Sequence, residues 1–120
     1  MQFDVERATV AGRPSLTVRG ELDLSTVPRL DAVASELLAG SAELVIDLTH
    51  TTFLDSSGAR TLLGLAKKAG AAGASLHVLA PRSNGPVRLT IDLLDLGAFV
   101  PLVASAGEIP TGIAGRDAGT

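Results

Sequence analysis

The chain has no cysteine, no tryptophan and no tyrosine, and only three phenylalanines among its 120 residues. Without cysteine it can form no disulfide, no thiolate metal site and no cysteine nucleophile. With so few aromatic rings it offers little surface on which unpaired bases could stack. Its 10 Lys and Arg are outnumbered by 13 Asp and Glu and are scattered, which argues against a surface that neutralises duplex phosphates. We therefore expect no nucleic-acid partner.

The chain also lacks the marks of secretion and of a membrane protein. Its first residues, Met1 to Glu6, do not have the basic-then-apolar layout of a signal peptide. The hydrophobic fraction of 46% is that of a globular protein, and 120 residues are enough to bury one core without disulfides or metal. We expect a cytoplasmic single domain over residues 1–120 with no membrane contact. Its core should span about residues 3–104, followed by a flexible tail rich in Gly and Ala from Gly107.

Two elements are expected at the start of the chain. Apolar residues alternate with polar ones on both sides of the turn-forming stretch 11–14, which predicts an antiparallel hairpin. From Val27 to Leu38 the apolar residues follow helical spacing. Ser25 or Thr26 can cap this helix, and Gly40 can end it. The pattern therefore predicts a hairpin followed by an amphipathic helix.

Short apolar runs and helical stripes alternate through the middle of the chain. The runs Leu44 to Leu48 and Leu76 to Leu79 are typical of strands that are covered on both faces of a parallel sheet. Between them a polar turn leads into a second helix, expected from about Ser57 to Ala69. Its last residues include two lysines, which suit the negative end of the helix dipole.

The stretch from Val87 to Leu96 fits two patterns, because its apolar residues alternate like those of a strand and also form helical stripes. We favour a helix that ends at Gly97, since a strand-helix-strand alternation then reaches a last strand at Phe99 to Val103. The sequence therefore predicts an α/β fold, with a mixed sheet flanked by about three to four helices.

The segment from Thr51 to Gly58 lies between a buried strand and the start of a helix. In an open parallel sheet this is the carboxyl edge, where functional loops gather. The backbone amides and the positive dipole end of a helix N-terminus can stabilise a phosphate carried by a nearby hydroxyl. Asp55, Ser56 and Ser57 are also ordinary N-cap residues, and local physics alone favours that interpretation.

Three motifs together carry a resemblance to a known family. They are Gly20 to Asp23 before the first helix, the run Val45 to Leu48, and Phe53 to Gly58 with its Asp-Ser-Ser-Gly centre. In order and spacing they resemble the STAS family of anti-sigma-factor antagonists. The resemblance covers about Phe3 to Ala104, which is most of the chain.

The resemblance implies a fold and a function. The fold is the STAS fold, with an N-terminal antiparallel hairpin and later parallel strands. The function is that of a bacterial anti-sigma-factor antagonist in transcription regulation by partner switching. Ser56 would be phosphorylated by an anti-sigma serine kinase and dephosphorylated by a phosphatase. The unphosphorylated form would bind the kinase and free a sigma factor. The expected partner surface surrounds Ser56 and comprises Asp23, Ser25, Asp55, Ser57 and Gly58.

Two features depart from the family pattern, and one other function stays open. The segment from Ser83 to Gly97 is longer than the usual family helix, and Arg60 stands where a small or apolar residue is more common. Some small STAS proteins are stable, non-phosphorylated accessory subunits of lipid-transport ATPases, although the Asp-Ser-Ser-Gly motif favours the switch. Nucleotide binding is disfavoured, because no Gly-rich phosphate loop follows a strand.

An enzyme is not expected. No serine lies in a nucleophile-elbow pattern, and no cluster of His, Asp and Glu has metal-ligand spacing. The two histidines, His50 and His77, lie in a turn and in a strand, and we assign neither a catalytic role. We therefore expect no catalytic residue, no metal and no cofactor.

Overall fold

The described part of the chain opens with a β-hairpin. In this computed structural model, which describes residues 2–110, β1 (Asp4–Val10) and β2 (Arg13–Leu22) pair antiparallel. Ala11 and Gly12 form the turn, and both have positive φ, as a two-residue hairpin turn of type I′ requires. The expected hairpin is confirmed.

Every later strand that pairs in the sheet runs parallel to its neighbour. β3 (Glu43–Asp47) pairs with β2, β5 (Ser75–Leu79) pairs with β3, and β6 (Leu102–Val103) pairs with β5. The strand order is β1-β2-β3-β5-β6. This is the mixed sheet predicted from the sequence, an antiparallel hairpin followed by parallel strands.

One strand occupies a stretch for which the sequence pattern predicts a polar turn. β4 (Thr51–Leu54) pairs parallel with the far end of β2. Along its length β2 pairs first with β3 and then with β4, and the register of the β4 pairing shifts between Gly20 and Glu21. Gly20 has a φ of +93°, and a Cβ there would lie 2.7 Å from the carbonyl oxygen of Gln2. Only glycine fits this bulge without strain.

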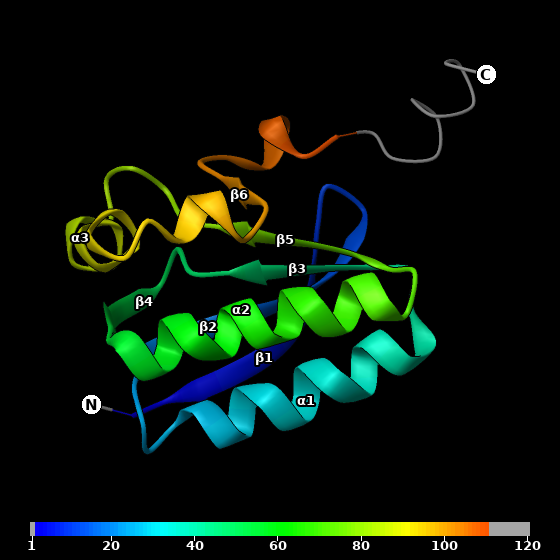
Figure 1. Ribbon diagram of the computed structural model, residues 1–120, viewed down its shortest axis with the longest axis horizontal. Helices are drawn as coiled ribbons and strands as arrows, with labels where there is room; N and C mark the ends of the chain where they lie inside the picture. The colour runs from blue at the N-terminus through cyan, green and yellow to red at the C-terminus, as the bar shows by residue number, and fades with distance from the viewer. Residues whose placement is uncertain (1, 111–120) are drawn as a thin grey trace.

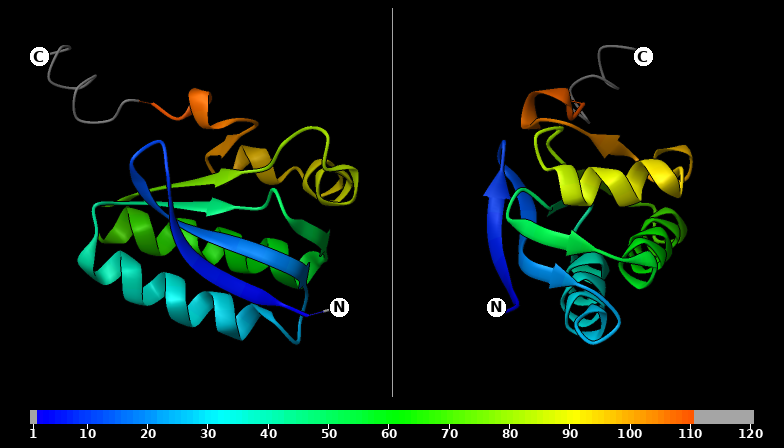
Figure 2. Two further views of the ribbon diagram at one scale, coloured as in Figure 1. Left: turned by 180° about the vertical axis from the view of Figure 1, so that it is seen from behind. Right: turned by 90° about the vertical axis from the view of Figure 1, so that its left-hand side faces the viewer.

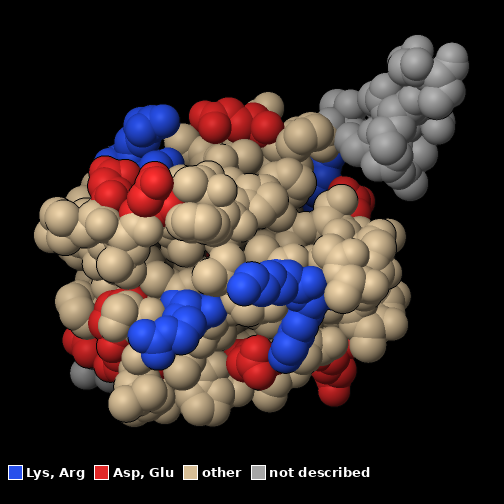
Figure 3. Space-filling view, in the orientation of Figure 1, with Lys and Arg blue, Asp and Glu red and all other residues tan. Residues whose placement is uncertain are grey.

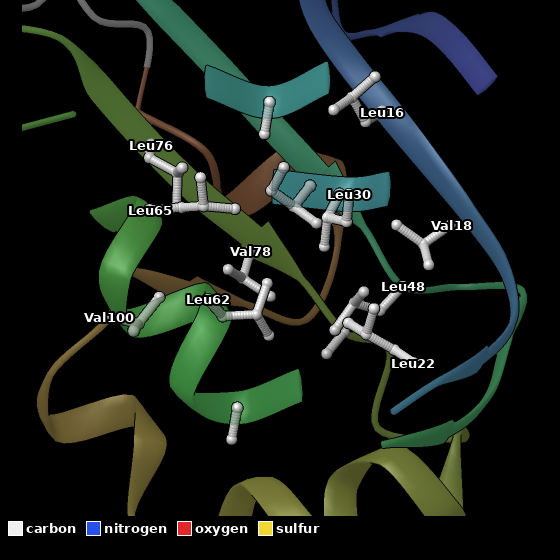
Figure 4. Close-up of a cluster of buried hydrophobic side chains, with 14 of the residues drawn as sticks. Leu16, Val18, Leu22, Leu30, Leu48, Leu62, Leu65, Leu76, Val78 and Val100 are labelled. Atoms are coloured by element: carbon white, nitrogen blue, oxygen red, sulfur yellow. The ribbon is translucent and has the colours of Figure 1, made fainter. Parts of the chain in front are cut away.

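Helices α1 (Val27–Gly40) and α2 (Ser56–Ala71) lie side by side on one face of the sheet, and α3 (Gly85–Leu93) lies beyond β4 at one end (Figures 1 and 2). Their apolar stripes meet the sheet in one main core (Figure 4). Its labelled members are Leu16, Val18, Leu22, Leu30, Leu48, Leu62, Leu65, Leu76, Val78 and Val100. None of the helices within residues 2–110 has the length and apolar character needed to cross a membrane.

Two expected elements after β5 differ from the structure. The third helix forms but ends at Leu93, because Asp95 adopts a left-handed φ of +51°, and a short 3-10 helix follows at Leu96–Ala98. The expected strand Phe99 to Val103 is reduced to β6. Pro101 has no N–H to donate, and Val100 turns into the core instead of joining the sheet.

The segment after β6 packs on the second face of the sheet. A 3-10 helix at Ala106–Glu108 leads to Ile109, which is buried against Val45, Leu79 and Val103. The expected flexible tail from Gly107 is therefore packed in its first residues, and its end lies outside the described residues.

Candidate functional site

The site lies where two neighbouring parallel strands end. Leu22 of β2 is opposite Leu54 of β4, and the backbone N–H of Asp55 donates to the carbonyl oxygen of Leu22 at 3.3 Å. Asp23 and Asp55 are the residues that follow these two strands, so they share one edge of the sheet. Asp23 and Asp55, which are 32 positions apart in the sequence, thus both lie near the start of α2.

Asp55 is the N-cap of α2. Its carboxylate accepts a hydrogen bond from the Gly58 N–H at 2.9 Å, and its backbone carbonyl accepts one from the Ala59 N–H at 3.0 Å. Ser56 and Ser57 lie inside the helix, so the capping interpretation holds for Asp55 alone. Within residues 2–110, the N–H groups of these two serines have no hydrogen-bond partner. Two donors at the positive end of the helix dipole are therefore unused.

The two serines differ in exposure. The side chain of Ser56 is exposed, whereas Ser57 is half-buried. A protein that approaches this edge of the sheet therefore meets the Ser56 hydroxyl first.

Asp23 and Ser25 hold the loop that leads into α1. The Ser25 hydroxyl donates to the Asp23 carboxylate at 2.8 Å, and the Ser25 N–H donates to the same oxygen at 3.0 Å. The hydrogen bond from the Ser25 side chain is the largest cause that lowers the pKa of Asp23 below its usual value, and partial burial opposes it. Thr26 donates to the carbonyl oxygen of Glu21 at 2.7 Å. Asp23 is thus a carboxylate that orders its own loop.

Gly58 is a packing residue, and one expectation about it is wrong. A Cβ at this position would lie 2.5 Å from Cδ1 of Leu54 and 2.7 Å from the carbonyl oxygen of Leu22. From its place in the motif alone, a bulky residue at Gly58 is expected to weaken kinase binding more than folding, with the core untouched. The backbone that approaches Gly58 belongs to β2 of the same chain, so any added side chain would collide inside the fold.

Two side chains of the α3 region contribute to the site without a signal in the sequence. The Thr90 hydroxyl donates to the carbonyl oxygen of Leu54 at 2.6 Å. The Asn84 side-chain amide donates to the carbonyl oxygens of Leu48 at 3.0 Å and Thr51 at 2.8 Å. These bonds fasten α3 to β4, directly beside the start of α2.

An apolar groove of about 260 Å³ borders Ser56. On one side the groove is lined by residues of α2, namely Ser56, Ala59, Arg60 and Leu63. On the facing side it is lined by residues that follow the end of α3, namely Leu94, Leu96 and Phe99. We call it the α2–α3 groove. Two of its large apolar side chains are exposed, Phe99 at 64% and Leu94 at 46%. Contiguous exposed apolar surface of this kind marks an interaction site.

One signal in the sequence pointed to the groove. The stretch from Val87 to Leu96 carries more apolar residues than one buried helix face can use. Val87 and Ile91 enter the core, whereas Leu89 and Leu93 remain exposed. From the same stretch, Leu94 and Leu96 line the α2–α3 groove.

The exposed face of α2 is basic. Figure 3 shows basic groups over this helix, whose cations are Arg60, Lys67 and Lys68. Lys68 contacts Asp31 at 3.4 Å and Ser35 at 2.9 Å. Arg60 has no ion pair or hydrogen bond within residues 2–110, and its side chain is exposed. A cation without a partner therefore stands at the groove, on the same helix as Ser56.

The histidines lie apart from this site. His50 lines a separate open hollow of about 510 Å³ with Thr49, Thr52 and Asn84. His77 lies on β5, where burial is the main cause that lowers its pKa and Arg13 lowers it further. Among the described residues, no three His, Asp or Glu side chains gather in a way that could hold a metal ion.

Comparison with known proteins agrees with the fold. Residues 6–103 match the family model described as Mlab, STAS domain. No curated protein matches the chain in sequence. An anti-sigma factor antagonist from Mycobacterium paratuberculosis has a similar structure, with a TM-score of 0.73 and 28% identity, over 98% of this chain and 93% of that one.

Two further solved structures share the fold at lower identity. SpoIIAA in its unphosphorylated form gives a TM-score of 0.62 at 22% identity, over 99% of this chain and 98% of that one. The Bacillus cell fate determinant SpoIIAA in its phosphorylated form gives 0.55 at 20% identity, over 99% and 100%.

Proposed function

Because the chain belongs to the STAS domain family, we propose that it is an anti-sigma-factor antagonist, a binding protein rather than an enzyme, that is switched by phosphorylation of Ser56. One observation carries the proposal: the Ser56 hydroxyl is exposed in the first turn of α2, beside two N–H groups that no described residue uses. The similarity to the mycobacterial antagonist over nearly the whole chain supports the partner class.

The switch needs an anti-sigma kinase and a nucleoside triphosphate. The Ser56 oxygen forms a bond to the γ-phosphorus of ATP, the bond from that phosphorus to the β,γ-bridging oxygen breaks, and ADP leaves with the electron pair. The hydroxyl proton passes to a base of the kinase. Hydrolysis by a phosphatase reverses the modification. The unused N–H groups of Ser56 and Ser57 can donate to the added phosphate, so the modification should not unfold the helix start.

The added charge is enough to dissociate the complex with the anti-sigma factor. A phosphoserine carries about −1.5 to −2 charges at pH 7. At an effective dielectric constant of about 20, a like charge about 6 Å away on the partner costs roughly 3 kcal/mol per unit charge before screening. This corresponds to about a hundredfold loss of affinity. The unphosphorylated form therefore binds the anti-sigma factor and frees its sigma factor, whereas the phosphorylated form does not.

The partner surface extends beyond the residues named from the sequence. Asp23 and Asp55 follow two paired strand ends, Ser25 is hydrogen-bonded to Asp23, Ser57 adjoins Ser56, and Gly58 acts on this surface through packing. The α2–α3 groove continues it on the other side, because Ser56 itself lines that groove. The partner would bury the apolar rim of the groove, and phosphorylation of Ser56 would regulate the binding.

The test is phosphorylation and binding of three variants with candidate anti-sigma kinases. Intact-mass measurement after incubation with ATP should show one added phosphate on the parent and on Ser57→Ala, and none on Ser56→Ala. Ser56→Ala should bind the kinase whether or not ATP is present. Ser56→Asp should bind poorly, although one carboxylate carries less charge than a phosphate. Full phosphorylation of Ser56→Ala would contradict the assignment and move the acceptor to Ser57 or Thr52.

The same experiment separates the second function. A non-phosphorylated accessory subunit of a lipid-transport ATPase would take no phosphate from any such kinase, and neither Ser56 variant would alter kinase binding. That result would favour the function of an accessory subunit over that of a phosphorylation switch.

A further inference from the structure

Arg60 is placed to reach Ser56. The two residues are four positions apart on α2, so they occupy the same side of the helix, with Cβ atoms about 5 to 6 Å apart. Helical side chains lean toward the N-terminus of their helix, which directs the long Arg60 side chain back over the preceding turn. Both residues line the α2–α3 groove.

The position of Arg60 is not explained by the stability of the helix. The positions three and four residues away on either side are Ser57, Leu63, Ser56 and Gly64, none of them acidic. Arg60 also lies near the positive end of the helix dipole, whereas Lys68 lies in the last turn, where a cation is favoured. Among the positions three and four residues away on its own helix, Arg60 therefore gains a negative neighbour only if Ser56 acquires a charge.

We propose that Arg60 is the intramolecular ligand of the phosphate on Ser56, which it holds by an ion pair across one turn of α2, at the mouth of the α2–α3 groove. This inference rests on the proposed phosphorylation of Ser56 and adds a second residue, Arg60, to the switch. The planar guanidinium matches the phosphate oxygens with two parallel hydrogen bonds. The modified protein then presents an ion pair where the unmodified protein presents an open apolar groove. Phosphorylation thus changes the shape of the partner surface as well as its charge.

The test uses the full chain with phosphoserine incorporated at position 56 during translation, so that no kinase is needed. Phosphorus NMR titration gives the second pKa of the phosphate, about 6 for an unpaired phosphoserine. An i,i+4 ion pair is worth about 0.5 kcal/mol, so Arg60→Gln should raise this pKa by about 0.4. Arg60→Lys keeps the charge without the planar fork and should fall between the parent and Arg60→Gln.

Lys67→Gln is the matched control, because it removes an exposed cation from the same helix, 11 positions from Ser56. It should leave the phosphate pKa within about 0.1 of the parent, since an exposed charge that far away is screened. The carboxylates of Asp55, Asp92 and Asp95, on the adjoining loop and the facing segment, are present in every variant and cancel in the comparison. An equal shift in Arg60→Gln and Lys67→Gln would overturn the proposal.

The outcome is separable from that of the proposed function. If candidate kinases never modify Ser56, the switch fails while the ion pair is still measured in the translated phosphoprotein. If the kinase modifies Ser56 but the phosphate pKa is the same in Arg60→Gln and Lys67→Gln, the proposed switch is supported and the proposed role of Arg60 is refuted.

Discussion

The carboxylate of Asp55 accepts a hydrogen bond from the backbone N–H of Gly58 at 2.9 Å, and this contact fixes where α2 begins. It satisfies one of the donors that a helix start leaves unpaired. Because Asp55 takes this role, the following serine is free to project from the first turn. The geometry of the proposed phosphorylation site therefore depends on a neighbour that is not itself modified.

Loss of this cap should destabilise the protein. We expect Asp55→Ala to lower the free energy of unfolding by about 1 kcal/mol, because the Gly58 N–H loses its acceptor. Asp55→Asn should stay close to the parent, since asparagine caps a helix about as well as aspartate. Urea unfolding measures the difference. Equal losses in the two variants would show that charge, and not capping, is what Asp55 contributes.

Two glycines of α2 should respond in opposite ways to alanine. Gly58→Ala should cost about 1 to 3 kcal/mol, because its Cβ would meet Leu54 and the Leu22 carbonyl at contact distances that no side chain adopts. Gly64→Ala should stabilise by about 0.5 to 1 kcal/mol, because no atom lies within 4 Å of its Cβ and alanine is the better helix former. Thermal and urea unfolding of the pair give the test. A Gly58→Ala variant as stable as Gly64→Ala would refute the packing role.

The loop before α1 should show its own dependence on pH. The folded-state pKa of Asp23 is lowered from its usual 3.8, chiefly by the hydroxyl of Ser25. A lowered pKa means that this carboxylate stabilises the folded state above pH 3.8 and that the contribution is lost as the pH falls through the folded-state value. Ser25→Ala should move the pKa of Asp23 back toward 3.8, as followed by NMR of the carboxyl carbon. An unchanged pKa in that variant would assign the lowering to the backbone instead.

The apolar rim should matter for the partner and not for the fold. Phe99→Ser should weaken binding of the anti-sigma factor about tenfold, which corresponds to about 1.4 kcal/mol. Its unfolding free energy should change by less than about 0.5 kcal/mol, because the ring is 64% exposed. Ala39→Ser, an exposed apolar-to-polar change at the far end of α1, is the control and should alter neither quantity. Calorimetric titration measures the binding, and loss of binding in both variants would exclude a specific role for the groove.

Much of the fold was predictable because its signals are local. The alternation around the hairpin, the stripe from Val27 to Leu38 and the apolar runs of β3 and β5 each follow from the period of one element. The family resemblance carried by the motifs is confirmed by the match over residues 6–103. The expected helix start within two residues of Ser57 is confirmed, since α2 begins at Ser56.

The elements that escaped prediction depend on partners far along the chain. β4 has only four residues, with Thr51 and Leu54 buried and the two between them exposed, so it lacks the alternation of a strand. It is a strand because β2 continues past β3 and offers free backbone groups. The last strand shrank to Leu102–Val103 because Pro101 cannot donate and Val100 found a place in the core. Neither outcome can be read from local spacing.

The sequence by itself determined the order of the elements, the serine at the start of a helix and the family, because hydrophobic period, turn residues and a short motif are properties of neighbouring residues. Only the tertiary structure decided what surrounds that serine. It brought Leu22 against Gly58 and so made the glycine a core residue, fastened α3 to β4 through Thr90, and lined a groove beside the serine with apolar residues that follow α3. These contacts join residues that are 36 positions apart, and they form only when strand pairing and burial of the whole core are satisfied together.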